Sequence, residues 1–346
     1  MLPYWLLFLV PAVAVFWPGR ADERTRRLLW LSVGALFTLV IGLRYQVGGD
    51  WHGYIGYLNR ASLMSLPEVL AAGDPGYYFV NWVAAQLGGD IYWVNLFCGA
   101  VVMAGVVTFA RRQPLPWLAL LVAVPYLIMV VAMGYTRQAT ALGFAMLGLA
   151  ALEQERTRAF VFWVVIGALF HKTAVLLLPI AAMASSGNRL WTGFWVGVTA
   201  VTAAALLLLD SSQQLWANYV EADYQSQGGL IRVAMNALPA VLFLMVYRYL
   251  DLSLAQRRLW FWMSLLAIAC IPLVLISSTA VDRMALYLIP IQMFVFARLF
   301  QVFEDPVLRG TVVAGVVGYY ATVQLVWLTM ATHAFAWLPY RFAPLV

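Results

Sequence analysis

The stretch LLWLSVGALFTLVIGL, residues 28–43, has no charged residue in sixteen positions, and RYQVGGDWHGY, residues 44–54, follows it directly. An apolar run of this length is close to that of a membrane-crossing helix. The next eleven residues place an arginine, an aspartate, a histidine and three glycines at the end of that helix. Ionisable side chains near a bilayer are unfavourable and usually mark a functional site, so the second stretch is the first candidate for one.

The rest of the chain repeats this alternation of apolar runs and short polar segments. Of its 346 residues 64% are hydrophobic and 10% are charged, and the mean hydropathy is +0.84. The apolar runs are about 15 to 21 residues long and lack the period-two alternation of a membrane β-barrel. The sequence therefore predicts an all-α polytopic membrane protein, with a single transmembrane domain over residues 1–346 and no soluble domain.

The apolar runs predict about 12 membrane crossings. They lie at residues 3–17, 28–43, 91–110, 115–132, 137–152, 159–170, 173–186, 190–209, 231–247, 259–276, 284–300 and 310–330. Residues 159–170 and 173–186 are half-length and meet at FHKTA, as do broken helices that line a polar cavity. Residues 76–88 predict an amphipathic or re-entrant helix on the outer face, because a crossing here would invert every later loop. Two long outer loops are expected, at 44–75 and 210–230.

The basic residues predict the orientation. Fourteen of the 21 Lys and Arg residues fall in loops on one side, beginning with GRADERTRR, residues 19–27. Because translocated loops are poor in Lys and Arg, that side is expected to be cytoplasmic, and both termini are expected outside. The other seven are on the outer face: Arg44, Arg60, Arg137, Lys172, Arg232, Arg283 and Arg341. The net charge of +6 is thus mostly a topology signal, and no nucleic-acid partner is expected.

MGYTRQAT, residues 133–140, begins a predicted span with Thr136 as a candidate N-cap and with Arg137 and Gln138 in the first turn. Free backbone N–H groups, the helix dipole and a guanidinium would together attract an anion at the outer face. Each outer arginine alone is equally well explained as an anchor that reaches the lipid head groups. Their coincidence at one depth favours a binding site.

SSTAVDRMALY, residues 277–287, also places an arginine at the start of a predicted span: Arg283 begins the span and Tyr287 follows one helical turn later. The alternative is a surface pair between Asp282 and Arg283. Two arginines at two helix starts would clamp a diphosphate.

Two further polar stretches reach the outer face. LFHKTAVLLLP, residues 169–179, supplies His171 and the single lysine, Lys172, although a lone histidine is more often a packing residue. GDPGYYFVNW, residues 73–82, supplies Asp74 and Tyr77, or is simply a turn built on Asp-Pro-Gly. The three histidines lack ligand spacing and no acidic cluster is present, so no metal and no other cofactor is expected.

Five stretches occur in this order: GLRYQVGGDWHGY, DPGYYFVNW, YTRQATALGF, FHKTAVLLLP and DRMALYLIP. Over about residues 30–300 they resemble the EpsG-type branch of the Wzy-like polysaccharide polymerases. Asp74 departs from the family pattern, which reads Glu-Pro-Gly. The resemblance implies a GT-C-like helical architecture and a metal-independent glycosyltransferase of exopolysaccharide, capsule or O-antigen assembly. It also implies location in the bacterial inner membrane, with the active site on the periplasmic or extracellular face.

Such enzymes join oligosaccharide repeats that are linked to undecaprenyl diphosphate, so the expected partners are lipid-linked donor and acceptor glycans, membrane lipid and a chain-length regulator protein. Transfer needs a base for the acceptor hydroxyl and cations for the leaving diphosphate. The candidate bases are Asp50 and His171, and the candidate diphosphate ligands are Arg44, Arg137, Arg283 and Lys172. The candidate substrate-binding residues are Trp51, Tyr54, Asp74, Tyr77, Gln138 and Tyr287.

Two other functions fit part of this pattern. An O-antigen ligase would use the same arginines with a different acceptor, and the sequence barely separates it from a polymerase. A flippase or transporter of lipid-linked oligosaccharide should instead carry polar groups at the membrane midplane and show repeat symmetry.

Overall fold

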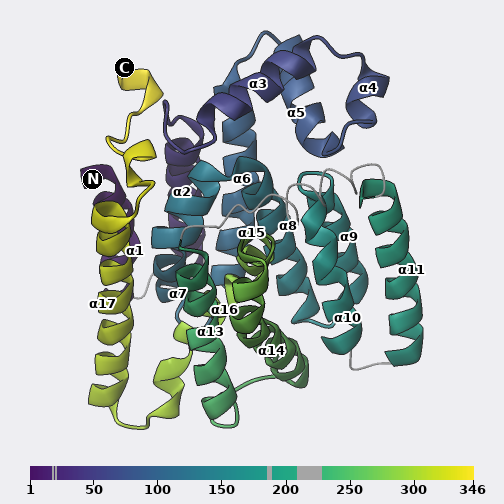
Figure 1. Cartoon of the computed structure of the whole chain (residues 1–346). Helices are drawn as coiled ribbons and strands as arrows, with labels where there is room; N and C mark the ends of the chain where they lie inside the picture. Colours follow the sequence, from purple (N-terminus) through teal and green to yellow (C-terminus); the bar gives the residue numbers. More distant parts are fainter. Residues whose placement is uncertain (18, 20–21, 185–188, 209–227) are drawn as a thin grey trace.

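The structure is a computed structural model that describes residues 1–17, 19, 22–184, 189–208 and 228–346, and this part of the chain is helical, with no strand (Figure 1). Before residue 185 the elements are α1 (Leu2–Phe16), α2 (Glu23–Gly42), α3 (Trp51–Ser62), α4 (Leu66–Leu70), α5 (Pro75–Gln86), α6 (Ile91–Ala110), α7 (Pro116–Ala123), the π-helix η1 (Val124–Ala132), α8 (Thr136–Leu152), α9 (Thr157–Ala168), η2 (Lys172–Leu177) and α10 (Leu178–Ala184). The later elements are α11 (Arg189–Leu208), α13 (Gly229–Val246), α14 (Leu254–Ile276), α15 (Ser278–Ala285), η5 (Leu286–Leu288), α16 (Pro290–Phe296), η6 (Leu299–Val302), α17 (Pro306–Met330), η7 (Ala334–Ala336) and η8 (Ala343–Leu345).

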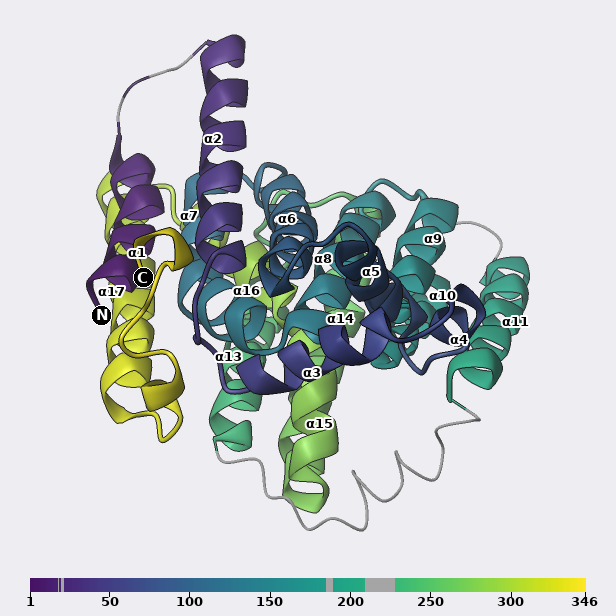
Figure 2. The same ribbon diagram turned by 90° about the horizontal axis from the view of Figure 1, so that it is seen from above.

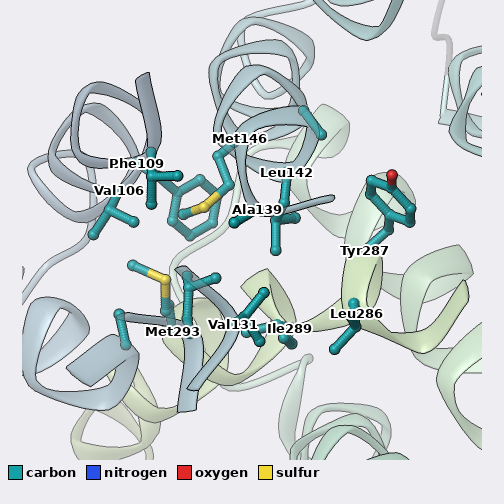
Figure 3. Packing of buried hydrophobic residues seen from close by; sticks show 14 of the residues in the cluster. Val106, Phe109, Val131, Ala139, Leu142, Met146, Leu286, Tyr287, Ile289 and Met293 are labelled. Carbon is teal, nitrogen blue, oxygen red and sulfur yellow. The ribbon is translucent and has the colours of Figure 1, made fainter. Parts of the chain in front are cut away.

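Helices α6 and α8 pack against each other at the centre of the core. Of the 17 residues of α8, 14 are buried, as expected for a helix that is apolar on all sides and covered by its neighbours. Figure 3 shows Val106 and Phe109 of α6, Met146 of α8 and Met293 of α16 meeting in this core. Tyr287 lies at the edge of the same cluster, so the core also fixes part of the polar region described below.

In the part of the chain that the structure describes, five helices are long and apolar enough to cross a membrane: α2, α6, α13, α14 and α17. A bent pair, Ser278–Leu288 and Pro290–Val302, would add a sixth, with 45° between its halves. Each of the twelve predicted crossings overlaps a helix of the described chain, several of them shorter apolar helices of 10–17 residues. The chain is therefore an all-α protein with several membrane-compatible helices, while the count of twelve and the GT-C-like architecture stay predictions.

The helix break at FHKTA is confirmed. Helix α9 ends at Ala168, His171 has extended backbone angles (φ −154°, ψ 108°), and η2 begins at Lys172. The expected helix at 76–88 is α5, whose 12 residues are too few to cross a bilayer. Its place relative to the membrane stays a prediction.

The segment expected to be a long loop at 44–75 contains two helices, α3 and α4, which pack with α5 at one end of the bundle (Figure 1). The short helix α4 forms because Ser65 and Glu68 make a capping box, with Ser65 N–H donating to Glu68 Oε2 at 2.7 Å. The loop expected at 210–230 lies outside the described residues, apart from its last three.

The two ends of the chain lie close together, with α17 running beside α1 (Figures 1 and 2). A hydrogen bond from Gln324 Nε2 to Tyr4 O at 3.2 Å joins these helices. After Met330 the C-terminal segment turns over the end of α2: Tyr45 N–H donates to Arg341 O at 2.9 Å, and Ala343 N–H donates to Leu43 O at 2.8 Å. The C-terminal segment thus supports the loop after α2, at residues 43–50, which contains the first candidate site residues.

Candidate active site

Arg44 lies two residues beyond the end of α2 and is only 1% exposed. Its guanidinium donates to Ile41 O at 2.5 Å, Val47 O at 3.2 Å and Thr136 Oγ1 at 2.9 Å, with a longer contact to Asn95. These bonds tie the end of α2 to the start of α8. We therefore assign Arg44 to holding the loop after α2 in place, since its donors already have acceptors in the protein.

Gly48 brings this loop against the stretch MGYT. Its φ is +103°, a value that suits glycine alone, and a Cβ atom here would lie 2.2 Å from Met133 O. The amide of Gly48 also donates to Ala336 O at 2.9 Å. Gly49 faces open space, and Asp50 follows it, solvent-accessible, as the N-cap residue of α3.

Asp74 and Arg137 form an ion pair, with 2.5 Å between Arg137 Nη1 and Asp74 Oδ2. The Asp74 side chain is 7% exposed and that of Arg137 is 28% exposed, so the pair is open only on the arginine side. The Arg137 guanidinium also lies over the Tyr57 ring, 4.6 Å from its centroid. Gly76 N–H donates to Leu169 O at 2.8 Å, which places the start of α5 against the helix break at His171.

Arg283 reaches the same region from α15. Its Nη1 lies 3.5 Å from Gln138 Oε1, and Gln138 Nε2 donates to Arg283 O at 2.6 Å. The guanidinium lies over the Tyr135 ring, 5.1 Å from the centroid. The charges of Arg137 and Arg283 both act on Asp50 and on His171, so the two predicted cations border the same region.

Two local expectations are wrong. Arg283 lies in the last turn of α15, which begins at Ser278. It is therefore not at the helix N-terminus that the sequence had predicted. The N-cap of α8 is Tyr135, without a side-chain cap, because the Thr136 hydroxyl accepts from Arg44 instead. The alternative pairing of Asp282 with Arg283 is also wrong: Asp282 accepts two bonds from Arg232, at 2.7 and 2.6 Å.

His171 is 9% exposed, and its Nδ1 lies 2.6 Å from Thr173 Oγ1. Burial lowers the pKa of His171 to about 3, and the charges of Arg137 and Arg283 act in the same direction. The imidazole is therefore neutral near pH 7, and its environment includes both arginines. The charge of Lys172 acts on Asp74 and Arg137, so the lysine lies beside the same pair.

The two carboxylates share this environment. Burial raises the pKa of Asp50, and the charges of Arg283 and Arg137 lower it in part. Burial also raises the pKa of Asp74, against the charges of Arg137 and Lys172. A polar cluster is thus assembled from the stretches around Asp50, Asp74, Arg137, His171 and Arg283, at the end of the bundle that carries α3–α5.

The aromatic residues predicted to bind substrate are all buried: Trp51, Tyr54, Tyr77 and Tyr287. Trp51 is 5% exposed and contacts the rings of Tyr45 and Tyr92, while Tyr54 and Tyr77 pack edge-to-face at 5.8 Å. The half-buried Tyr57, one turn after Tyr54, is the ring that meets Arg137, and sequence reasoning missed it. Its spacing from Tyr54 on α3 was the available signal. Tyr135, Thr173 and the Arg232–Asp282 pair were also missed, because their partners are distant in sequence.

Among the described residues, no group of three or more His, Cys, Asp or Glu side chains is placed to hold a metal ion. Comparison with curated proteins and with solved structures gave no match. The model of the EpsG family matches residues 27–342, which is nearly the whole chain and includes every member of the polar cluster. Such membership supports a membrane polysaccharide polymerase of glycosyltransferase type. The chain belongs to the EpsG family.

Proposed function

We propose that this protein is an inverting polysaccharide polymerase that joins oligosaccharide repeats linked to undecaprenyl diphosphate, on the outer face of the bacterial inner membrane. The observation that carries the proposal is that Arg137 and Arg283, the latter held by Gln138, border one region, with Asp50 and His171 in the electrostatic field of both arginines. Two guanidinium groups beside one carboxylate and one neutral imidazole suit the transfer of a glycosyl group from a diphosphate.

In this reaction a hydroxyl oxygen of the acceptor sugar attacks the anomeric carbon of the donor from the face opposite the diphosphate. The new C–O bond forms as the bond to the diphosphate oxygen breaks, which inverts the anomeric centre. The diphosphate leaves with the bonding electron pair, and Arg137 and Arg283 stabilise its growing charge. Lys172 adds a third positive charge on the His171 side.

Asp50 is the base in this proposal. Asp50 is exposed and follows the unobstructed Gly49, and the protein around it desolvates the carboxylate enough to raise its pKa, which makes it a stronger base than an ordinary aspartate. His171 is a weaker base, because its low pKa means poor proton affinity. We therefore place Asp50 on the acceptor hydroxyl and His171 beside the sugar.

Asp74 holds Arg137 while no substrate is bound. Its carboxylate occupies one side of the guanidinium and Tyr57 covers a face, which keeps a charged group ordered in a partly buried place. A diphosphate approaching from the exposed side of Arg137 would share or replace the Asp74 contact. Gln138 holds Arg283 in place, and Tyr287 holds the helix break at His171 in place.

The test is polymerisation by the purified protein in lipid nanodiscs, supplied with a lipid-diphosphate-linked repeat unit. A ladder of lengthening glycans is expected from the wild type, and little or none from Arg137→Ala or Arg283→Ala. The matched control is Arg111→Ala, which should give the wild-type ladder. Arg111 is an exposed arginine at the C-terminal end of α6. Normal ladders from both Arg137→Ala and Arg283→Ala would refute the clamp, and a wild type that only moves the lipid across a bilayer would favour the transporter.

A further inference from the structure

Thr173 lies between His171 and Tyr287, two side chains that are 9% and 2% exposed. Its hydroxyl oxygen is 2.6 Å from His171 Nδ1, and the hydroxyl donates to Tyr287 OH at 3.3 Å. The helix break fixes this geometry, because Ala174 N–H donates to His171 O at 3.0 Å and closes the turn that contains Thr173. Tyr287 is held in turn by the core, at the edge of the cluster in Figure 3.

The position of the Thr173 hydroxyl links the tautomer of His171 to Tyr287. A threonine hydroxyl has one hydrogen to donate, and the 3.3 Å contact with Tyr287 OH suits that donation. With its hydrogen on Tyr287, the threonine oxygen can make the 2.6 Å contact with His171 only by accepting from Nδ1–H. A neutral imidazole carries a single N–H, so Nε2 keeps its lone pair. No group in the described part of the chain hydrogen-bonds to Nε2.

We infer that Thr173 is a positioning residue that holds His171 in the Nδ1–H tautomer, so that Nε2 accepts a hydrogen bond from a sugar hydroxyl of the glycan. The inference rests on the proposed function for the identity of that ligand. An imidazole lone pair repels the oxygen lone pairs of a diphosphate, so the histidine contacts the sugar while the arginines contact the diphosphate. The role of His171 is thereby separated from that of Arg137 and Arg283.

The first test reads the tautomer directly and does not need activity. The chain has three histidines, and His52 and His333 are exposed, so His52→Gln and His333→Gln leave His171 as the only one. Nitrogen-15 NMR of the labelled imidazole should show a protonated Nδ1 and an unprotonated Nε2. Thr173→Val should shift the population toward the Nε2–H form, and Thr173→Ser should restore the original signals. A protonated Nε2 in the wild type, or an identical spectrum in Thr173→Val, would overturn the inference.

The second test separates acceptor binding from donor binding. Thr173→Val should raise the KM for the glycan about tenfold, the size expected when one hydrogen bond is misdirected, with donor diphosphate affinity unchanged. Thr173→Ser should stay close to the wild type. Weakened donor binding with an unchanged KM for the acceptor glycan would refute the role of His171 toward the sugar. If the wild type makes no polymer, the proposed function fails, whereas the NMR result still decides the tautomer.

Discussion

Substitution of Gly48 tests how tightly the loop before Asp50 is held. In Gly48→Ala the new Cβ would lie 2.2 Å from Met133 O, a backbone atom that cannot swing aside, and the φ of +103° is unfavourable for alanine. The backbone strain costs about 1–3 kcal/mol, and relief of the overlap costs about 1–3 kcal/mol more. We therefore expect Gly48→Ala to lower the free energy of unfolding by about 2–6 kcal/mol. The loop would also move away from α8, taking Asp50 with it.

Gly49→Ala is the matched control, because nothing lies within 4 Å of its Cβ position and its φ lies outside the left-handed region. The assay is thermal unfolding of the purified protein, followed by polymerisation at a temperature where both variants are folded. Gly48→Ala should melt several degrees below Gly49→Ala and should make much less polymer. Equal melting temperatures, or equal polymer from the two variants, would refute the claim that Gly48 seats the loop on Met133.

Four further outcomes are expected. Asp50→Asn should lower turnover by about 10² to 10⁴, whereas His171→Gln should mainly weaken acceptor binding; the reverse pattern in paired kinetics would make the histidine the base. Because burial raises the pKa of Asp50, activity should fall on acidification at a pH above about 4, the range of an ordinary aspartate, and a lower midpoint in the pH–rate profile would contradict this. Asp74→Asn should lower the free energy of unfolding by about 1–3 kcal/mol in denaturation experiments, since the pair with Arg137 is only partly screened by solvent. In intact spheroplasts a membrane-impermeant maleimide should label His52→Cys and should leave Arg156→Cys unlabelled; the opposite result would invert the topology.

Several features could be predicted from the sequence because they depend on neighbours along the chain. Long apolar runs form helices in any arrangement, so α2, α6 and α17 lie close to their predicted ranges. The break at His171 and the separate helix at α5 were also predicted, from a short apolar run and from Asp-Pro-Gly. The candidate residues came from the rarity of charge in an apolar chain, and that signal is local too.

Partners and exposure depend on contacts between distant segments, and only the tertiary structure decided them. Arg44 looks like Arg137 in sequence, yet it is buried and bonded to Ile41, Val47 and Thr136, the last of these at the start of α8. Arg283 needed a partner 145 positions away, Gln138, and the helix that carries it begins earlier than the apolar run indicates. The sequence by itself determined which polar residues exist in this membrane protein and near which helix ends they lie, since hydrophobicity and helix length are properties of short segments. Packing decided which of those residues meet, because a guanidinium becomes a structural tie or a ligand-binding group according to the acceptors that the folded chain brings within about 3 Å.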